Sequence, residues 1–350
     1  MIDFRYHLVS IVAVFLALAV GIVLGSTELR GAAFTALDRT SNALSHKLDA
    51  ANNENSALQQ EVNGDRSFAQ AAEPVLLAHL LDGKRVVVIT APGAPAGVVS
   101  GIRTALGDAG ATVSGQVALS AKFADTSASS LSLLDQLTQR VVPSGLTLAN
   151  GTPQQQAAQV LASALVSSGS SSSRSGGSGG SSSGGSGSYT GDRQAAQTIL
   201  SSYSAGQFIT ITGQPAQGAA LAVILTPASA PADGNSDPAN QAIVSLAQEF
   251  GSGSEATVVA GPSAASGQGS AISAVRSSGA ANNASTVDNA DQVAGQIVVV
   301  QALYQQVDGH KPGSYGTQSG ANSAGPSPAP TPSGSPSASL RTSTSLKGKK

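Results

Sequence analysis

The chain has 350 residues, enough for one or two ordinary domains. Only 11% of the residues are charged, 3% are aromatic and the formal net charge is -2, so the chain lacks the basic face that a general nucleic-acid binder needs. It contains no cysteine, which excludes disulfides and thiolate metal sites.

The first predicted element is an apolar helix over residues 6–26. Between Arg5 and Glu28 lie 22 residues without a formal charge, with His7 counted as neutral. About 20 apolar residues in a helix cross a hydrocarbon core of roughly 30 Å. A cleaved signal peptide is the alternative, but only one arginine precedes the segment, Asp3 offsets it, and no clean Ala-x-Ala site follows. We therefore predict a retained transmembrane anchor over residues 1–27.

Small residues recur every fourth position along this segment: Ala13, Ala17, Gly21 and Gly25. Such a stripe lets two helix backbones approach closely and favours association within the bilayer, although alanine and glycine are common throughout the chain. Basic residues near the two ends of the helix do not decide its orientation. The very short N-terminal tail favours a cytoplasmic N-terminus with the body of the protein exported.

Residues 28–73 are predicted to form a coiled-coil stalk. The segment is polar, and its apolar residues fit a heptad repeat. The seam contains Leu37, Leu44, Leu48, Asn55, Leu58 and Val62, with Phe34, Ser41 and Ala51 at the remaining positions. An asparagine at an a position, here Asn55, is typical of dimers with a fixed register. The segment therefore predicts a homo-oligomer, at least a dimer. The alternative is an amphipathic helix that packs on its own body.

Residues 80–310 are predicted to form an α/β body in which strands and helices alternate. Strands are expected at 84–89, 111–118, 208–212, 221–225, 257–260 and 285–287. Helices are expected at 98–106, 131–142, 153–166, 193–203, 240–250, 271–277 and 291–307. The strands are apolar throughout, which is typical of a sheet covered on both faces. This pattern predicts a mostly parallel, Rossmann-like three-layer domain.

Two segments have the composition of flexible chain. Residues 167–188 consist of serine and glycine with one arginine, and we expect them to be a flexible insertion on the surface of the body. Residues 311–350 are rich in proline, serine and threonine, and we expect them to form a disordered tail.

Catalytic signatures are mostly absent from the sequence, so we expect that the protein is not an enzyme and has no resident cofactor. The four histidines share no ligand-like spacing. The glycine-rich stretch 261–269 follows a strand and precedes a helix, where an anion could bind, but glycine is frequent in this chain. Asp288 and Asp291 follow the last predicted strand. They are weak candidates for a cation site, and the alternative is that Asp288 or Asn289 caps the following helix.

Two stretches carry a resemblance to a known family. These are the opening 26 residues, beginning Met-Ile-Asp-Phe-Arg-Tyr-His, and the closing Ser-Thr-Val-Asp-Asn-Ala-Asp of 285–291 with its apolar helix and Tyr315-Gly316. Together with the stalk and the α/β body they resemble the actinobacterial copper transport protein MctB family, over about residues 1–316.

The resemblance implies a cell-envelope protein of copper efflux and copper homeostasis, and the family is described as pore-forming and as located in the outer membrane. Copper would be the transported ion. Because Cu(I) prefers thiolate and thioether ligands and Met1 is the sole sulfur-bearing residue, we expect copper handling through assembly or envelope partners. Two further hypotheses are a coiled-coil scaffold or interaction module without enzymatic activity, and an enzyme that uses Asp288 and Asp291.

Overall fold

The computed structural model describes residues 4–167, 193–215 and 218–327. The chain divides into two units, residues 1–65 and residues 66–350. The expected insertion at 167–188 and the part of the expected tail beyond residue 327 lie almost entirely outside the described residues, apart from Ser167.

The first unit is helical throughout its described length and forms the N-terminal part of α1 (Phe4–Leu77). The span Arg5–Gly25 has a mean hydropathy of 2.9 and is long and apolar enough to cross a membrane. Its apolar side chains are exposed, and so are the seam side chains Leu37, Leu44, Leu48, Leu58 and Val62. The helical state of the expected stalk is thus confirmed, whereas its pairing into a coiled coil stays a prediction.

The last turns of α1 belong to the second unit. Pro74 lies inside the helix, which we expected to stop there, and α1 continues for only three more residues. Proline removes one helical hydrogen bond and crowds the preceding turn, which accounts for the end of α1 soon after Pro74. Ala69 and Leu77 pack into the hydrophobic core of the body, followed by Leu80 and Leu81.

A seven-stranded sheet forms the centre of the second unit, in the order β3-β2-β1-β4-β5-β6-β7. The strands are β1 (Arg85–Thr90), β2 (Thr112–Leu119), β3 (Ile209–Gly213), β4 (Leu221–Leu225), β5 (Ala256–Ala260), β6 (Ser285–Val287) and β7 (Ser314–Tyr315). Neighbouring strands run parallel except β3, which runs antiparallel to β2. The predicted mostly parallel sheet is confirmed, and the six predicted strands lie within one residue of their expected limits.

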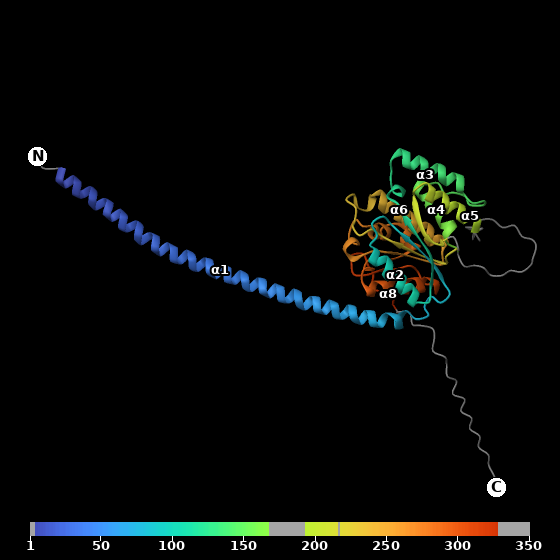
Figure 1. Ribbon diagram of the computed structural model, residues 1–350, viewed down its shortest axis with the longest axis horizontal. Coiled ribbons are helices and arrows are strands. Elements are labelled where there is room, and N and C mark those ends of the chain that lie inside the picture. The colour runs from blue at the N-terminus through green and yellow to red at the C-terminus, as the bar shows by residue number, and fades with distance from the viewer. Residues whose placement is uncertain (1–3, 168–192, 216–217, 328–350) are drawn as a thin grey trace, which may run out of the picture. The chain divides into compact units, whose positions relative to one another are not determined.

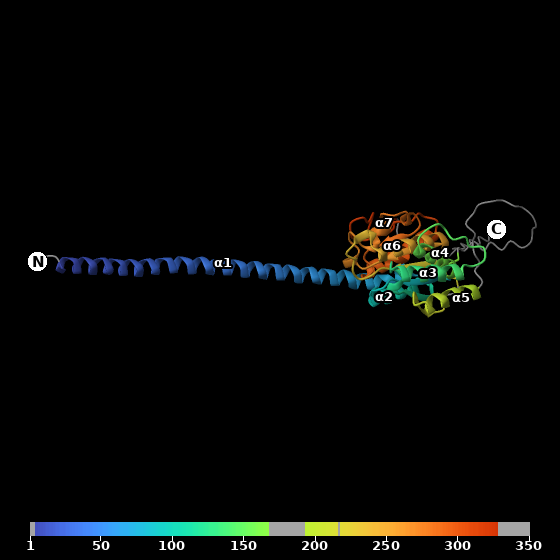
Figure 2. The same ribbon diagram turned by 90° about the horizontal axis from the view of Figure 1, so that it is seen from above.

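Helices cover both faces of this sheet (Figure 1). They are α2 (Ala96–Asp108), α3 (Ala128–Val141), α4 (Pro153–Leu165), α5 (Arg193–Ala205), α6 (Pro238–Gly253), α7 (Ala271–Arg276) and α8 (Val293–Val307). Helices α2 and α8 lie on one face and α3 to α7 on the other. On the second face α4 lies between α6 and α3 (Figure 2).

The two core clusters explain why the central strands β1, β4 and β5 are apolar along most of their length. In β1, Val86 and Val88 are buried under α2 and α8, while Val87 and Ile89 are buried on the opposite face. A strand whose successive side chains point to opposite faces must therefore be apolar at every position when both faces are covered. The order from β3 to β6 matches that of dinucleotide-binding sheets, but β3 is antiparallel, so the Rossmann-like character stays a prediction.

The body extends beyond its expected limit at residue 310. Strand β7 pairs with β6, and the amide of Gly316 donates to the carbonyl of Ser323 at 3.0 Å. The Tyr315 side chain is buried, and its hydroxyl donates to Gln305 Oε1 at 3.0 Å. The expectation of a disordered tail from residue 311 is therefore wrong up to residue 327. Proline and serine content predicted disorder, but Tyr315 supplies the apolar surface that anchors the segment.

Candidate functional site

Asp288 and Asp291 lie where β6 gives way to α8, at the carboxyl end of the sheet, as expected. The two residues differ in their surroundings. Asp288 is fully buried, whereas Asp291 is exposed. They share no hydrogen-bond partner in the described part of the chain, so the structure does not join them into one site.

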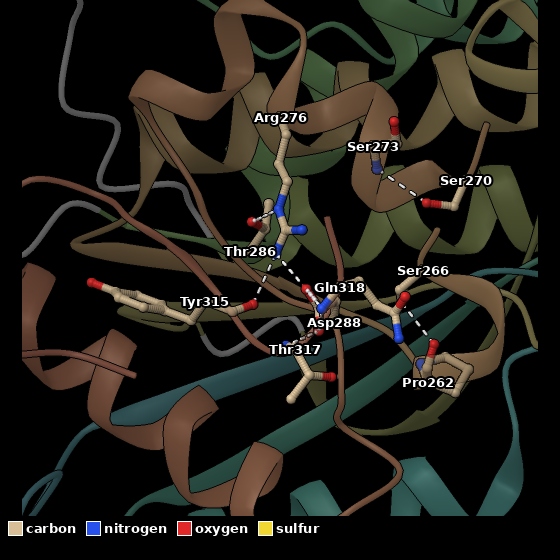
Figure 3. Close-up of polar contacts among 10 residues, drawn as sticks. All are labelled: Pro262, Ser266, Ser270, Ser273, Arg276, Thr286, Asp288, Tyr315, Thr317 and Gln318. Atoms are coloured by element: carbon tan, nitrogen blue, oxygen red, sulfur yellow. Dashed lines mark hydrogen bonds and ion pairs between the residues drawn. The ribbon is translucent and has the colours of Figure 1, made fainter. Parts of the chain in front are cut away.

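Asp288 forms a buried ion pair with Arg276, the last residue of α7 (Figure 3). Arg276 Nη2 donates to Asp288 Oδ2 at 3.0 Å and to the Tyr315 carbonyl at 2.8 Å, and Nε donates to Thr286 Oγ1 at 2.8 Å. Both side chains are at least nine-tenths buried, so each charge depends on the other for its stabilisation. The guanidinium thereby ties α7 and β6 to the end of β7.

The other contacts of Asp288 hold the segment that follows β7. Its carboxylate accepts hydrogen bonds from the backbone amides of Thr317 at 2.7 Å and Gln318 at 3.2 Å. Gly316 precedes them with a φ of +131°, and a Cβ there would overlap the Asp288 carboxylate. Glycine is therefore required at position 316 both by its backbone conformation and by the close approach of Asp288. We name the contacts among Arg276, Asp288, Tyr315, Thr317 and Gln318 the C-terminal clamp.

Helix α8 is capped differently from what the sequence suggested. Its N-cap is Gln292, which makes no side-chain capping bond, so neither Asp288 nor Asn289 is the cap. Burial beneath the segment 316–318 directs Asp288 away from the helix. Asp291 Oδ1 instead accepts from the amide of Ser263 at 2.8 Å and from its hydroxyl at 2.9 Å, which joins the loop after β5 to the loop after β6.

The glycine-rich stretch 261–269 is held by its own serines (Figure 3). Ser266 Oγ donates to the Pro262 carbonyl at 2.7 Å, and Ser270 Oγ accepts from the Ser273 amide at 3.1 Å as the N-cap of α7. Helix α7 has only six residues. Because the Ser273 amide already donates to Ser270, it is not free to bind an anion. The stretch therefore has fewer available amide donors than its position suggested.

Metal-binding side chains are dispersed in the described part of the chain, where no group of three His, Cys, Asp or Glu residues could hold an ion. His79 Nδ1 lies 2.8 Å from Asp82 Oδ2, and both side chains are exposed. His310 Nδ1 lies 3.6 Å from Asp308 Oδ2, also at the surface. Asp288 is a poor cation ligand because its carboxylate is already paired with the Arg276 guanidinium.

Sequence reasoning missed Arg276, Thr317 and Gln318. A signal for Arg276 existed, because it is the only arginine or lysine between Arg193 and Lys311. Because arginine is almost never fully buried without a partner, burial of Arg276 would have implied a nearby acidic residue, but the sequence does not show that it is buried. Thr317 and Gln318 take part through backbone amides, which leave no mark on side-chain chemistry.

The fold and the site define a class of α/β protein with a helix that is apolar enough to cross a membrane. Its mostly parallel sheet is covered by helices on both faces, and the buried ion pair of Arg276 and Asp288 lies at one edge of that sheet. Comparison with known proteins identifies the family. The family model described as "Copper transport outer membrane protein, MctB" matches residues 1–326, so the chain belongs to the MctB family.

Relatives in mycobacteria carry the same name. The chain is 27% identical over 328 residues to the copper transporter MctB of Mycobacterium tuberculosis, covering 92% of this chain and 98% of that protein. It is 28% identical over 330 residues to the copper transporter MctB of Mycobacterium leprae, with the same coverage of both chains. The resemblance noted at the opening and closing motifs is thus confirmed, and the match extends to both units.

Proposed function

We propose that this protein supports copper efflux across the cell envelope as a membrane-anchored member of the MctB family. The family match over residues 1–326 carries the proposal, because it includes the apolar helix, the stalk and the body. Relatives that are similar along 98% of their length are named copper transporters. An outer-membrane location comes from the family description and has the same support.

Copper would be cargo for this protein, and its route is constrained by the available side chains. The chain has no cysteine and one methionine, Met1, whereas Cu(I) prefers sulfur ligands. The exposed pair His79 and Asp82 offers too few ligands to form a closed centre. We therefore infer that copper passes through an assembly or through envelope partners, with no resident metal centre or other cofactor in this chain and no enzymatic step.

Self-association of α1 is the second part of the proposal. The exposed seam of α1 supports a homodimer, because a heptad repeat buries its apolar side chains only against another helix with the same period. Glu61 and Arg66 occupy g and e positions of this repeat, so a parallel pair in register would bring opposite charges together between chains. One helix per chain cannot enclose a pore, so transport through this protein requires several copies or partners.

The orientation we propose has a cytoplasmic N-terminus and an exported body, with the lipid bilayer around Arg5–Gly25. The absence of native cysteine provides a clean test. Cysteine introduced at Ser229, an exposed loop position, should react with an impermeant thiol reagent in intact cells whose envelope admits the reagent. Cysteine introduced at Ile2 should react only after permeabilisation. The reverse pattern would contradict the orientation.

Deletion of the gene tests the function. Cells without the protein should accumulate more copper than the parent at equal external copper and should stop growing at a lower copper concentration. Cellular zinc serves as the control and should not change. Unchanged copper content and copper tolerance in the deletion strain would refute the proposal.

A scaffold that organises other envelope proteins is the alternative, and the exposed seam is the observation that favours it. The two functions differ in one respect: a scaffold predicts a growth or envelope defect that does not depend on copper. Chemical crosslinking that finds only monomers without envelope partners would count against the scaffold.

A further inference from the structure

A cavity of about 690 Å³ opens beside α2 at the carboxyl end of β1 and β2. Its walls include Thr90 and Ala91 at the end of β1, Val99 and Arg103 on α2, and Gln116 on β2. Binding sites for small molecules commonly have volumes of roughly 300–1,000 Å³. The size of the cavity therefore fits a small organic ligand.

The position of this cavity in the sheet has a physical reason. The chain leaves β1 for β2 on one side and later enters β4 on the other side of β1. The loops that follow β1 and β4 therefore diverge, and open parallel sheets bind ligands at this switch point. The cavity lies beside this point, on the β2 side, with walls from the loop after β1, from α2 and from β2. Strands β4 and β5 separate the cavity from the C-terminal clamp at β6 and β7, so the cavity is a separate feature.

The wall formed by the loop after β1 is already fixed. The Ala94 amide donates to the Ala91 carbonyl at 3.1 Å, and the Ala228 amide donates to the Gly93 carbonyl at 2.9 Å. Gly93 has a φ of +79°, and two prolines flank this turn at positions 92 and 95. A binding wall that needs little ordering favours affinity, because the entropy of ordering is not lost on binding.

The charge in the cavity is positive. Arg103 is the one charged side chain among the described residues that line it, and it has no ion-pair partner in the described part of the chain. Thr90 is 6% exposed, and its hydroxyl accepts a long hydrogen bond of 3.5 Å from Gln116 Nε2. The hydroxyl hydrogen of Thr90 has no acceptor among the described residues and can donate to a ligand. These groups favour a negatively charged ligand.

A smaller apolar cavity of about 140 Å³ adjoins the first one. The two cavities share Ala91, Pro92 and Leu119, and the smaller one continues toward Phe123 and Ile243. Among the described residues its lining has no charged side chain. A ligand that reaches from Arg103 past the shared residues would therefore place an apolar group there.

We propose that this pair of cavities binds a small organic anion, a carboxylate or phosphate joined to a short apolar group. Arg103 pairs with the anion, Thr90 donates a hydrogen bond to it, and the apolar group lies against Leu119 and Phe123. Copper transport does not require this site, so the inference is independent of the proposed function.

Hexanoate and hexyl phosphate are suitable probes for the full-length chain in nanodiscs, with 1-hexanol as the neutral analogue and empty nanodiscs as the background. Equilibrium dialysis should show binding of one or both anions. 1-Hexanol should bind at least about tenfold more weakly, because it cannot form the charged hydrogen bond to Arg103. Comparison of the two affinities shows whether the site prefers a carboxylate (hexanoate) or a phosphate (hexyl phosphate). A diazirine-bearing hexanoate should crosslink to residues 90–94 or 119–124.

Substitutions of one arginine in the cavity and one arginine outside it complete the test. Arg103→Gln should weaken binding of the anions about tenfold, and Arg103→Lys should restore part of it. Arg85→Gln removes an exposed arginine at the opposite end of β1 and should leave binding unchanged. Melting temperatures of the three variants report whether each is folded. Equal binding of 1-hexanol, unchanged binding by folded Arg103→Gln, crosslinks elsewhere, or no binding of any probe would overturn the proposal.

Discussion

The residues of the C-terminal clamp include one buried anion and one buried cation, Asp288 and Arg276. A buried ion pair in itself is weak evidence of stability, because desolvation opposes the attraction. Removal of one partner is different, since it leaves the other charge unpaired in the interior. The Arg276 side chain already has one nitrogen, Nη1, without a partner among the described residues, so it tolerates further loss poorly.

Substitution Asp288→Asn should therefore lower the free energy of unfolding by about 3 kcal/mol. Asparagine keeps the shape of the side chain but leaves the Arg276 charge uncompensated. The control, Asp291→Asn, affects an exposed residue whose carboxylate accepts hydrogen bonds from Ser263 alone among the described residues, and it should cost less than about 1 kcal/mol. Urea denaturation of both variants provides the measurement. Equal losses in the two variants would contradict the structural role of Asp288.

Glu73 on α1 should make the stability of the body depend on pH. Burial raises the pKa of the Glu73 carboxyl, and the negative charge of Asp108 raises it further. The folded protein therefore holds this proton more tightly than the unfolded chain does. The contribution of Glu73 to stability is fully present below the ordinary carboxyl pKa, and it is lost as the pH rises through the raised pKa of Glu73.

Substitution Glu73→Gln should remove this part of the pH dependence and stabilise the protein at neutral pH. Urea midpoints measured from about pH 4 to about pH 8 test the expectation, because Gln does not ionise in that range. A Glu73→Gln variant with the same pH profile as the parent would show that burial of this carboxyl has no consequence.

At the scale of elements, apolar runs marked the central strands β1, β4 and β5. Val86 to Ile89 and Leu221 to Leu225 are buried on both faces and read as continuous apolar sequence. Strand β7 could not be found in this way, because its two residues, Ser314 and Tyr315, show no period. Its place depends on contacts with β6 and Asp288, which lie about thirty residues earlier in the chain.

Truncation should separate the ordered part of the C-terminal segment from the rest. A chain that ends at Lys311 loses β7 and both amides that donate to Asp288, so it should lose about 3 kcal/mol of stability or more. A chain that ends at Ser327 retains all of these contacts and should be as stable as the full chain. Equal stability of the two truncated chains by thermal denaturation would contradict the role of the segment.

The heptad pattern of α1 predicted the helix correctly. Pairing of this helix with a second copy of the chain stays a prediction. Leu44 is a seam residue, whereas Ala50 lies on the same exposed helix outside the seam. In a parallel dimer, cysteine at position 44 faces its counterpart, and cysteine at position 50 points outward. We expect mild oxidation of the full chain in membranes to give a disulfide-linked dimer with Leu44→Cys and little with Ala50→Cys.

Comparable crosslinking of the Leu44→Cys and Ala50→Cys chains would indicate random collision in the membrane. Absence of a disulfide-linked dimer in the Leu44→Cys chain would contradict the predicted seam. Because the parent chain has no cysteine, any disulfide in these variants involves the introduced residue.

At the scale of the whole molecule, sequence and structure agree on an apolar N-terminal helix and a mostly parallel α/β body, and the family match covers both. The candidate site was located less well than the fold. Asp288 was singled out for its position at a strand end, but its role depends on Arg276 and on the segment 316–318. Such long-range partners are set by topology, which local patterns do not encode.

The rate at which cells lose copper tests the central claim most directly. Cells preloaded with radioactive copper and moved to copper-free medium should lose it more slowly when the gene is deleted, and expression of the full-length chain should restore the parental rate. Loss of radioactive zinc, measured in the same strains, should be equal in all of them. Copper loss at the parental rate in the deletion strain would contradict the proposed role in copper efflux.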